Sequence, residues 1–123
     1  MACEYELQPH EGYPIRIVKG STLREPVFWE DENGVPIDLT GVFIELQMRD
    51  AARGEITYVT LSTTNGGIIN KGVNGLEIYM DDTTTSEIQW SCAIYSLRLR
   101  MANGDVHRIL FGDVIAEEEI AHG

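Results

Sequence analysis

The side chains in this chain that could do chemistry are its histidines, cysteines and carboxylates, and their spacing decides what they could do. His10, His107 and His122 are far apart in the sequence, and none has the paired spacing of a zinc site. Cys3 and Cys92 form no C-x-x-C pair, and a reducing compartment favours two free thiols. We therefore predict no metal site and no cofactor from these residues.

Two acidic loops, residues 31–33 and residues 81–82, offer oxygen atoms of the kind that bind Ca²⁺. Neither loop has the spacing of an EF-hand, and aspartate is common in turns because it accepts hydrogen bonds from nearby backbone N–H groups. Carboxylate pairs for glycoside hydrolysis exist in so acidic a chain, but the sequence does not fix their separation. No G-x-S-x-G, P-loop or dinucleotide-binding motif is present. We predict no catalytic residues and no enzymatic activity.

Four aromatic residues are the candidates for an interaction surface, namely Phe28, Tyr58, Tyr79 and Trp90. Each could instead pack in the core or against a neighbour across a strand pair. Any ring that is exposed on the folded protein would mark a binding face.

Length and charge limit the class of protein. The chain has 123 residues, 43% of them hydrophobic, which suits one globular domain, and no apolar run approaches the roughly 20 residues that span a bilayer. The first residues lack the pattern of a secretory signal, so we expect synthesis in the cytoplasm. A formal net charge of −11 repels phosphate backbones and anionic lipid. We predict no nucleic-acid partner and no membrane insertion.

The elements that must position any site are strands, because apolar and polar residues alternate with a period of two. In the clearest run, Val42, Ile44, Leu46 and Met48 are expected to face the core while the residues between them face solvent. The same pattern recurs in residues 76–80 and residues 95–101, with Asn-Gly or Gly-rich turns between the runs. We expect Trp29 to be the largest member of the core.

One segment breaks this alternation. Residues 81–88 contain Thr84 and Glu87 at the spacing of a capping box, which predicts one short helical turn at an end of the fold. Taken together, the patterns predict an all-β protein: a two-layer antiparallel immunoglobulin-like β-sandwich with seven or eight short strands, with a barrel as the alternative.

Three segments are expected along the chain. Residues 1–12 form a polar N-terminal arm, residues 13–116 form the β-sandwich domain, and residues 117–123 form an acidic C-terminal tail that cannot order itself.

Several short motifs occur in an order that resembles a known family. They are Lys19-Gly-Ser-Thr22, Asn33-Gly-Val-Pro-Ile-Asp-Leu-Thr-Gly41, Thr64-Asn-Gly-Gly-Ile68, Asn74-Gly-Leu-Glu-Ile78, Tyr95-Ser-Leu-Arg-Leu99, Asn103-Gly-Asp-Val-His-Arg108 and Phe111-Gly-Asp-Val114. This set is similar to the immunoglobulin-like N-terminal domain of tailed-phage upper baseplate proteins, often called BppU-like, and of related prophage tail proteins. The resemblance covers about residues 15 to 116.

The resemblance implies a phage or prophage virion structural protein, synthesised in the host cytoplasm and located in the virion. In a chain of one domain it implies a small, non-catalytic assembly module of the tail, baseplate or capsid surface. The implied partners are other virion proteins and further copies of the chain in a ring or trimer. The alternative function is a carbohydrate or host-surface binding module that uses exposed aromatic rings.

Overall fold

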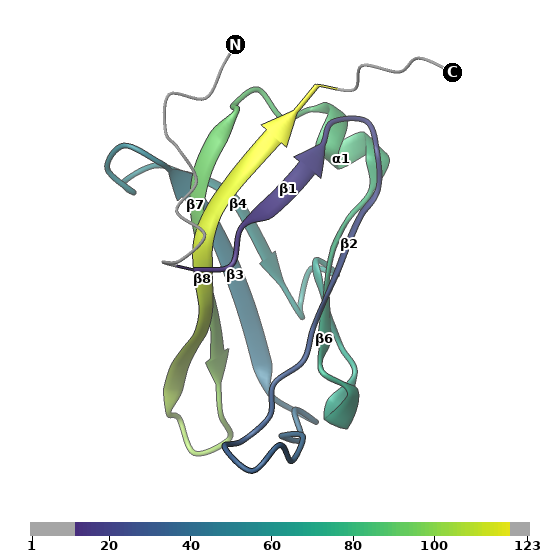
Figure 1. The fold of residues 1–123 in the computed structure, drawn as a ribbon, viewed down its shortest axis with the longest axis vertical. Coiled ribbons are helices and arrows are strands. Elements are labelled where there is room, and N and C mark those ends of the chain that lie inside the picture. Colours follow the sequence, from purple (N-terminus) through teal and green to yellow (C-terminus); the bar gives the residue numbers. More distant parts are fainter. Residues whose placement is uncertain (1–11, 119–123) are drawn as a thin grey trace.

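Alternating apolar residues build two β-sheets in the part of the chain that the computed structural model describes, residues 12–118 (Figure 1). The strands are β1 (Ile15–Val18), β2 (Leu23–Val27), β3 (Phe43–Asp50), β4 (Thr57–Ser62), β5 (Ile68–Asn70), β6 (Leu76–Met80), β7 (Cys92–Arg100) and β8 (Val106–Glu117). Two short helices complete the set, η2 (Gly72–Asn74) and α1 (Asp82–Ser86). The prediction of an all-β protein with one short helical turn after residue 81 is confirmed.

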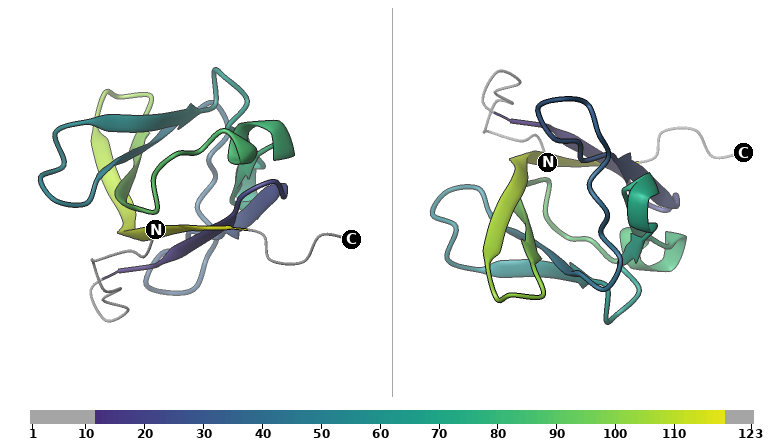
Figure 2. Two further views of the ribbon diagram at one scale, coloured as in Figure 1. Left: turned by 90° about the horizontal axis from the view of Figure 1, so that it is seen from above. Right: turned by 90° about the horizontal axis from the view of Figure 1, so that it is seen from below.

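The larger sheet has the strand order β1-β8-β7-β3-β4, and the smaller sheet has the order β2-β6-β5. Seen along the strands, the larger sheet curls around the core and the smaller sheet lies across from it (Figure 2). We call these two layers the five-stranded sheet and the three-stranded sheet.

The expectation of purely antiparallel sheets is wrong, because the five-stranded sheet is mixed. Strand β1 runs parallel to the last part of β8, with Ile15 in register with Val114 and Val18 with Glu117. Parallel neighbours cannot be joined by a tight turn, and here the paired strands are separated by almost the whole chain. No local pattern in the sequence signals such a pairing.

Local alternation places the core as expected. Val42, Ile44, Leu46 and Met48 are buried, and so are the inward residues of β6 and β7. Met101, expected inward as well, is only partly buried and packs against the core. Period-two alternation fixes which face of a strand is buried, so these strands could be placed from their own residues.

Trp29 does not take the place expected of it. It follows the end of β2, is only partly buried, and packs against the core from its rim, with its ring 6.4 Å from that of His107. The core of the described residues is instead mostly aliphatic, with Tyr95 as its buried aromatic residue.

The expectation of two free thiols is also wrong, because Cys92 is disulfide-bonded. Cys92 lies at the start of β7 and is partly buried, not fully buried as a small core residue would be. Cys3 lies outside the described residues. So do His10, His122 and most of the expected arm, and β8 extends one residue past the expected domain boundary, to Glu117.

Tyr95 connects the core to the segment that leads into β1. Its hydroxyl donates to the backbone carbonyl of Tyr13 at 2.5 Å, and burial raises the pKa of this phenol above its ordinary value. Gly112 faces the same segment, and a Cβ there would lie 2.5 Å from the Tyr13 carbonyl oxygen. The close approach of these backbones therefore requires glycine at position 112.

Helix α1 closes the end of the fold near the turn between β1 and β2 (Figure 1). Thr85 is fully buried, donates its hydroxyl to the Ser21 carbonyl at 2.8 Å and accepts the Gly20 N–H at 3.1 Å. The cap is Asp81, whose carboxylate accepts the Thr84 N–H at 2.7 Å, and not Thr84 as the capping-box spacing suggested. Aspartate satisfies the free N–H groups of the first turn and carries the charge that the helix dipole favours there.

Two carboxylates that accept backbone N–H groups, Asp81 and Asp50, should make stability depend on pH. Hydrogen bonds from Ile56 and Arg53 N–H groups lower the pKa of Asp50, and bonds from Thr84 lower that of Asp81. A depressed folded-state pKa contributes stability that is present above the unfolded value of about 3.9 and is lost as pH falls through the folded value.

We expect a D50N/D81N variant to lack this contribution. The difference in free energy of unfolding between the natural chain and the variant should be largest above about pH 5 and should shrink below about pH 4. Urea unfolding across this pH range measures the difference, and E32Q, which removes the charge of one exposed side chain away from both aspartates, is the control. A difference that does not change with pH would mean that the caps contribute through geometry alone.

Candidate interaction site

The outer face of the five-stranded sheet carries an unusual concentration of positive charge. Leu97 and Leu99 of β7 point into the core, so Arg98 and Arg100 point outward and are exposed. Arg49 of β3 and Arg108 of β8 lie on the same outer side. These four arginines are nearly half of the nine basic residues in a chain with 20 acidic ones.

A β-bulge sets the register of this face. Leu97 is paired with Leu110 and Arg98 with Arg108, so Ile109 is the extra residue on β8. Without the bulge, Arg98 would lie opposite Ile109, and the bulge instead brings the two arginines directly across from each other. Like charges at directly opposed positions destabilise a strand pair, and bulges are common where a functional side chain must be redirected.

Three of the four arginines contact aromatic rings or carbonyl oxygens. The guanidinium of Arg108 lies 4.7 Å from the ring centroid of Phe111, and that of Arg100 lies 5.9 Å from the ring of Phe43. Arg49 donates from Nη2 to the Gln47 Oε1 at 2.6 Å and from Nη1 to the Gly54 carbonyl at 3.2 Å. Cation–π contacts of this kind stabilise an arginine without neutralising its charge.

Within the described residues, Arg98, Arg100 and Arg108 form no ion pair, whereas the other exposed basic residues there do. Glu45 of β3 is in register with Arg98, but no ion pair joins the two side chains. We call this surface the arginine groove and define it by Arg49, Arg98, Arg100, Arg108, Phe43 and Phe111.

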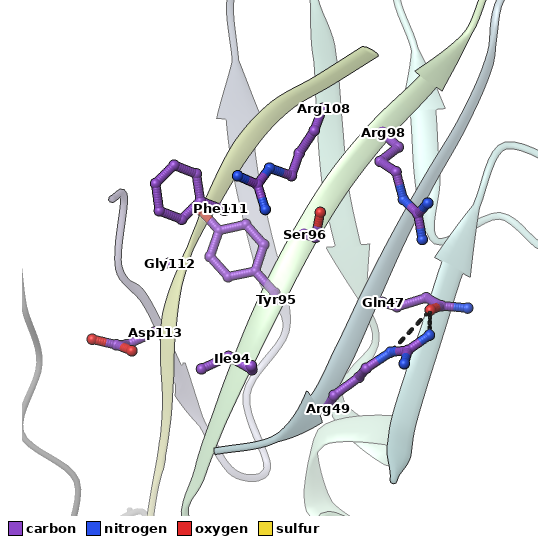
Figure 3. Close-up of a pocket in the computed structure, with 10 residues that line it drawn as sticks. All are labelled: Gln47, Arg49, Ile94, Tyr95, Ser96, Arg98, Arg108, Phe111, Gly112 and Asp113. Carbon is purple, nitrogen blue, oxygen red and sulfur yellow. Dashed lines mark hydrogen bonds between the residues drawn. The ribbon is translucent and has the colours of Figure 1, made fainter. Parts of the chain in front are cut away.

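The groove is an elongated depression along β7. One hollow of about 250 Å³ lies between β3 and β8 and is lined by Arg49, Arg98, Arg108 and Phe111, among others (Figure 3). A second hollow of about 110 Å³ contains Phe43, Arg98 and Arg100. Arg98 borders both hollows, so they form one open surface that follows the strand.

The structure brings together two of the four aromatic residues chosen from the sequence. The rings of Tyr58 on β4 and Trp90, in the connection before β7, are stacked with centroids 5.1 Å apart and 10° between their planes. Tyr58 is 37% exposed and Trp90 is partly buried, packed against the core. The pair is thus partly structural and presents one ring at the surface.

The other two aromatic residues lie elsewhere. Tyr79 on β6 is covered by the guanidinium of Arg24, which is 4.7 Å from its ring centroid, and Arg24 also pairs with Glu77. Phe28 follows β2 and is 71% exposed, the largest exposed fraction of any large hydrophobic side chain among the described residues. The four rings therefore do not form one surface.

Sequence reasoning placed Arg98 and Arg100 on an outer face but did not select them as a site. The signal was present, because arginine at every second position of a strand in an acidic chain is unusual. Arg108 could not be added to them, because the bulge that aligns it with Arg98 is not visible in the sequence.

Among residues 12–118, no group of three or more histidine, cysteine or acidic side chains is placed to hold a metal ion. None of the helices there is long and apolar enough to cross a bilayer.

No protein-family model matches the chain, and no curated protein matches its sequence.

Proposed function

We propose that this protein is a phage or prophage virion structural protein, a non-catalytic assembly module of the tail, baseplate or capsid surface with an immunoglobulin-like sandwich fold. The strand order supports the fold assignment. In immunoglobulin domains the strands C, F and G form one sheet and B, E and D the other, with C′ beside C in variable types. Here β8-β7-β3-β4 and β2-β6-β5 have that order, with β1 added at the free edge of β8.

The corner motif that carries the family resemblance has a structural role in this fold. Asp38 accepts hydrogen bonds from the N–H and hydroxyl of Thr40, and Leu39 is fully buried. Asn70 of β5 donates to the carbonyls of Leu39 and Val42, which fixes the corner before β3 to the three-stranded sheet. These contacts support the resemblance in fold, and the proposed role in the virion rests on the family that shares the motif.

The structural observation that supports an assembly role, beside the resemblance, is the arginine groove. It is an open, charged and aromatic surface supported by buried strands, and the arginine and aromatic side chains it offers are those enriched at protein interfaces. A rigid sheet loses little conformational freedom when it docks, so such a face suits repeated assembly contacts.

The experiment is to look for the chain in purified particles. Phage particles from the producing strain, purified by density-gradient centrifugation, should contain the chain at a fixed ratio to the major capsid protein by quantitative mass spectrometry. Light scattering of the purified chain should give the mass of a closed ring or trimer. A chain that is missing from particles and stays in the lysate would overturn the proposal.

Carbohydrate binding is the second candidate, and the stacked pair of Tyr58 and Trp90 favours it. Sugars bind on flat aromatic surfaces, and Tyr58 offers the exposed ring of this pair. A glycan array probed with the natural chain and with Y58A decides this alternative, because only binding that the variant loses supports it.

A further inference from the structure

We propose that the arginine groove is the docking site for a short, extended, acidic peptide segment of a partner protein. The inference deepens the proposed function, because it names the binding surface and the chemistry of the partner. That the partner is a protein rests on the proposed function. It is drawn from the charge, the shape and the register of the groove.

The charge of the groove points to a carboxylate ligand. Arg98 on β7 and Arg108 on β8 are paired in register, and neither has an acidic partner among the described residues. Their side chains point to opposite sides of β7, Arg98 toward Gln47 and Arg108 toward Phe111 (Figure 3). Two cations at paired positions repel each other, and a carboxylate bound beside either guanidinium would offset this repulsion. Guanidinium groups bind carboxylates through two parallel N–H···O bonds, which gives both affinity and a defined orientation.

The shape of the groove points to a segment of chain rather than a small molecule. The two hollows share Arg98 and extend along β7 from Ile94 to Arg100, which at about 3.3 Å per residue is roughly 20 Å. Phe111 lies in one hollow and Phe43 in the other, so apolar contacts are available on both sides of the central arginines. Figure 3 shows the hollow that contains Phe111. An extended segment with acidic residues between apolar ones fits the two hollows together.

The charge of the rest of the chain argues against nucleic acid as the occupant. The two hollows are lined by four arginines and by two acidic residues, Asp113 and Glu45, whereas the whole chain carries a net charge of −11. A phosphate backbone extends well beyond such a site and would be repelled by the acidic surface around it. This repulsion decreases only with distance and with added salt. A short peptide presents its charges within the groove alone.

The test is direct binding of a model ligand. Fluorescence anisotropy of fluorescein-labelled hexaglutamate, titrated with the full chain at about 0.05 M NaCl, should show saturable binding that weakens strongly at about 0.5 M. Labelled hexaglutamine should not bind. The variant R98Q/R108Q should weaken hexaglutamate binding about tenfold.

A matched control separates the groove from the overall charge. R16Q/R53Q removes the same number of charges at two exposed sites outside the groove. It should change hexaglutamate binding less than about twofold. R98Q/R108Q removes a repulsion between two exposed side chains and also the contact of Arg108 with Phe111. These effects oppose each other, so its melting temperature should stay close to that of the natural chain, which would show that the loss of binding is not a loss of fold.

Four results would overturn the inference. The first is no binding of hexaglutamate by the natural chain, and the second is equal weakening by both double variants. The third is an oligothymidine of equal charge that binds more tightly and depends on the same arginines. The fourth is self-association of the natural chain that R98Q/R108Q abolishes, which would make a second copy the occupant. A chain that is present in particles but does not bind hexaglutamate would leave the proposed function standing.

Discussion

G75A should lower the free energy of unfolding by about 3 to 5 kcal/mol. Gly75 connects η2 to β6 with φ +83° and ψ −143°, a conformation that side chains with a Cβ strongly disfavour. A Cβ at this position would also lie 2.1 Å from the carbonyl oxygen of Val27, at the end of β2. Because that atom belongs to the backbone of a paired strand, it cannot move aside without disturbing the three-stranded sheet.

The matched control for this variant is G34A. Gly34 has nearly the same φ, +78°, but no atom lies within 4 Å of the position that a Cβ would occupy. G34A should lower the free energy of unfolding by only about 1 to 2 kcal/mol, which is the strain of the backbone conformation by itself. Urea unfolding followed by circular dichroism measures both variants. Equal losses would show that β2 yields to the added methyl group and that the close approach contributes nothing.

N70A should cost about 2 to 3 kcal/mol, the second largest effect that we expect. The Asn70 side-chain amide donates to the carbonyls of Leu39 at 2.7 Å and Val42 at 3.2 Å, and its oxygen accepts the Gly72 N–H at 2.9 Å. These bonds cross from β5 to the corner before β3, and removing them leaves partly buried polar groups without this partner. Such groups cost more than the bonds themselves contribute.

N103A is the comparison for this second variant. Asn103 also bonds within a turn, to the N–H and carboxylate of Asp105, but both residues are exposed. Water can replace those bonds, so the loss should stay at or below about 1 kcal/mol. If N70A and N103A lose the same free energy, the contact between the corner and the three-stranded sheet is not a separate source of stability.

Local patterns in the sequence predicted the parts of this fold that depend on neighbouring residues. The alternation from Val42 to Met48 correctly assigned the buried face of β3, because the period of a strand is set by its own backbone. The Asn-Gly turn at 103–104 likewise placed β7 beside β8. The position of the short helix was also predicted, although its cap is Asp81.

The features that the sequence did not reveal depend on distant residues. The parallel pairing of β1 with β8, the disulfide at Cys92 and the rim position of Trp29 all arise from how remote segments meet. The candidate site shows the same limit. Aromatic residues were chosen by type, yet Trp90 is stacked on Tyr58 and Tyr79 lies under Arg24. The alignment of Arg98 with Arg108 depends on one extra residue in β8, Ile109, which forms the bulge.

The parallel pairing of β1 with β8 also determines how this domain would respond to mechanical force. Because the two strands run in the same direction, the chain joins β1 at one end of the pair and leaves β8 at the other. Tension applied through residues 12 and 118 would therefore load the hydrogen bonds between these strands in shear, all at once, and would not peel them apart in succession. If the domain is connected to other proteins through both ends, the β1–β8 pair would bear the tension first. The domain would then resist being stretched because these hydrogen bonds must break together.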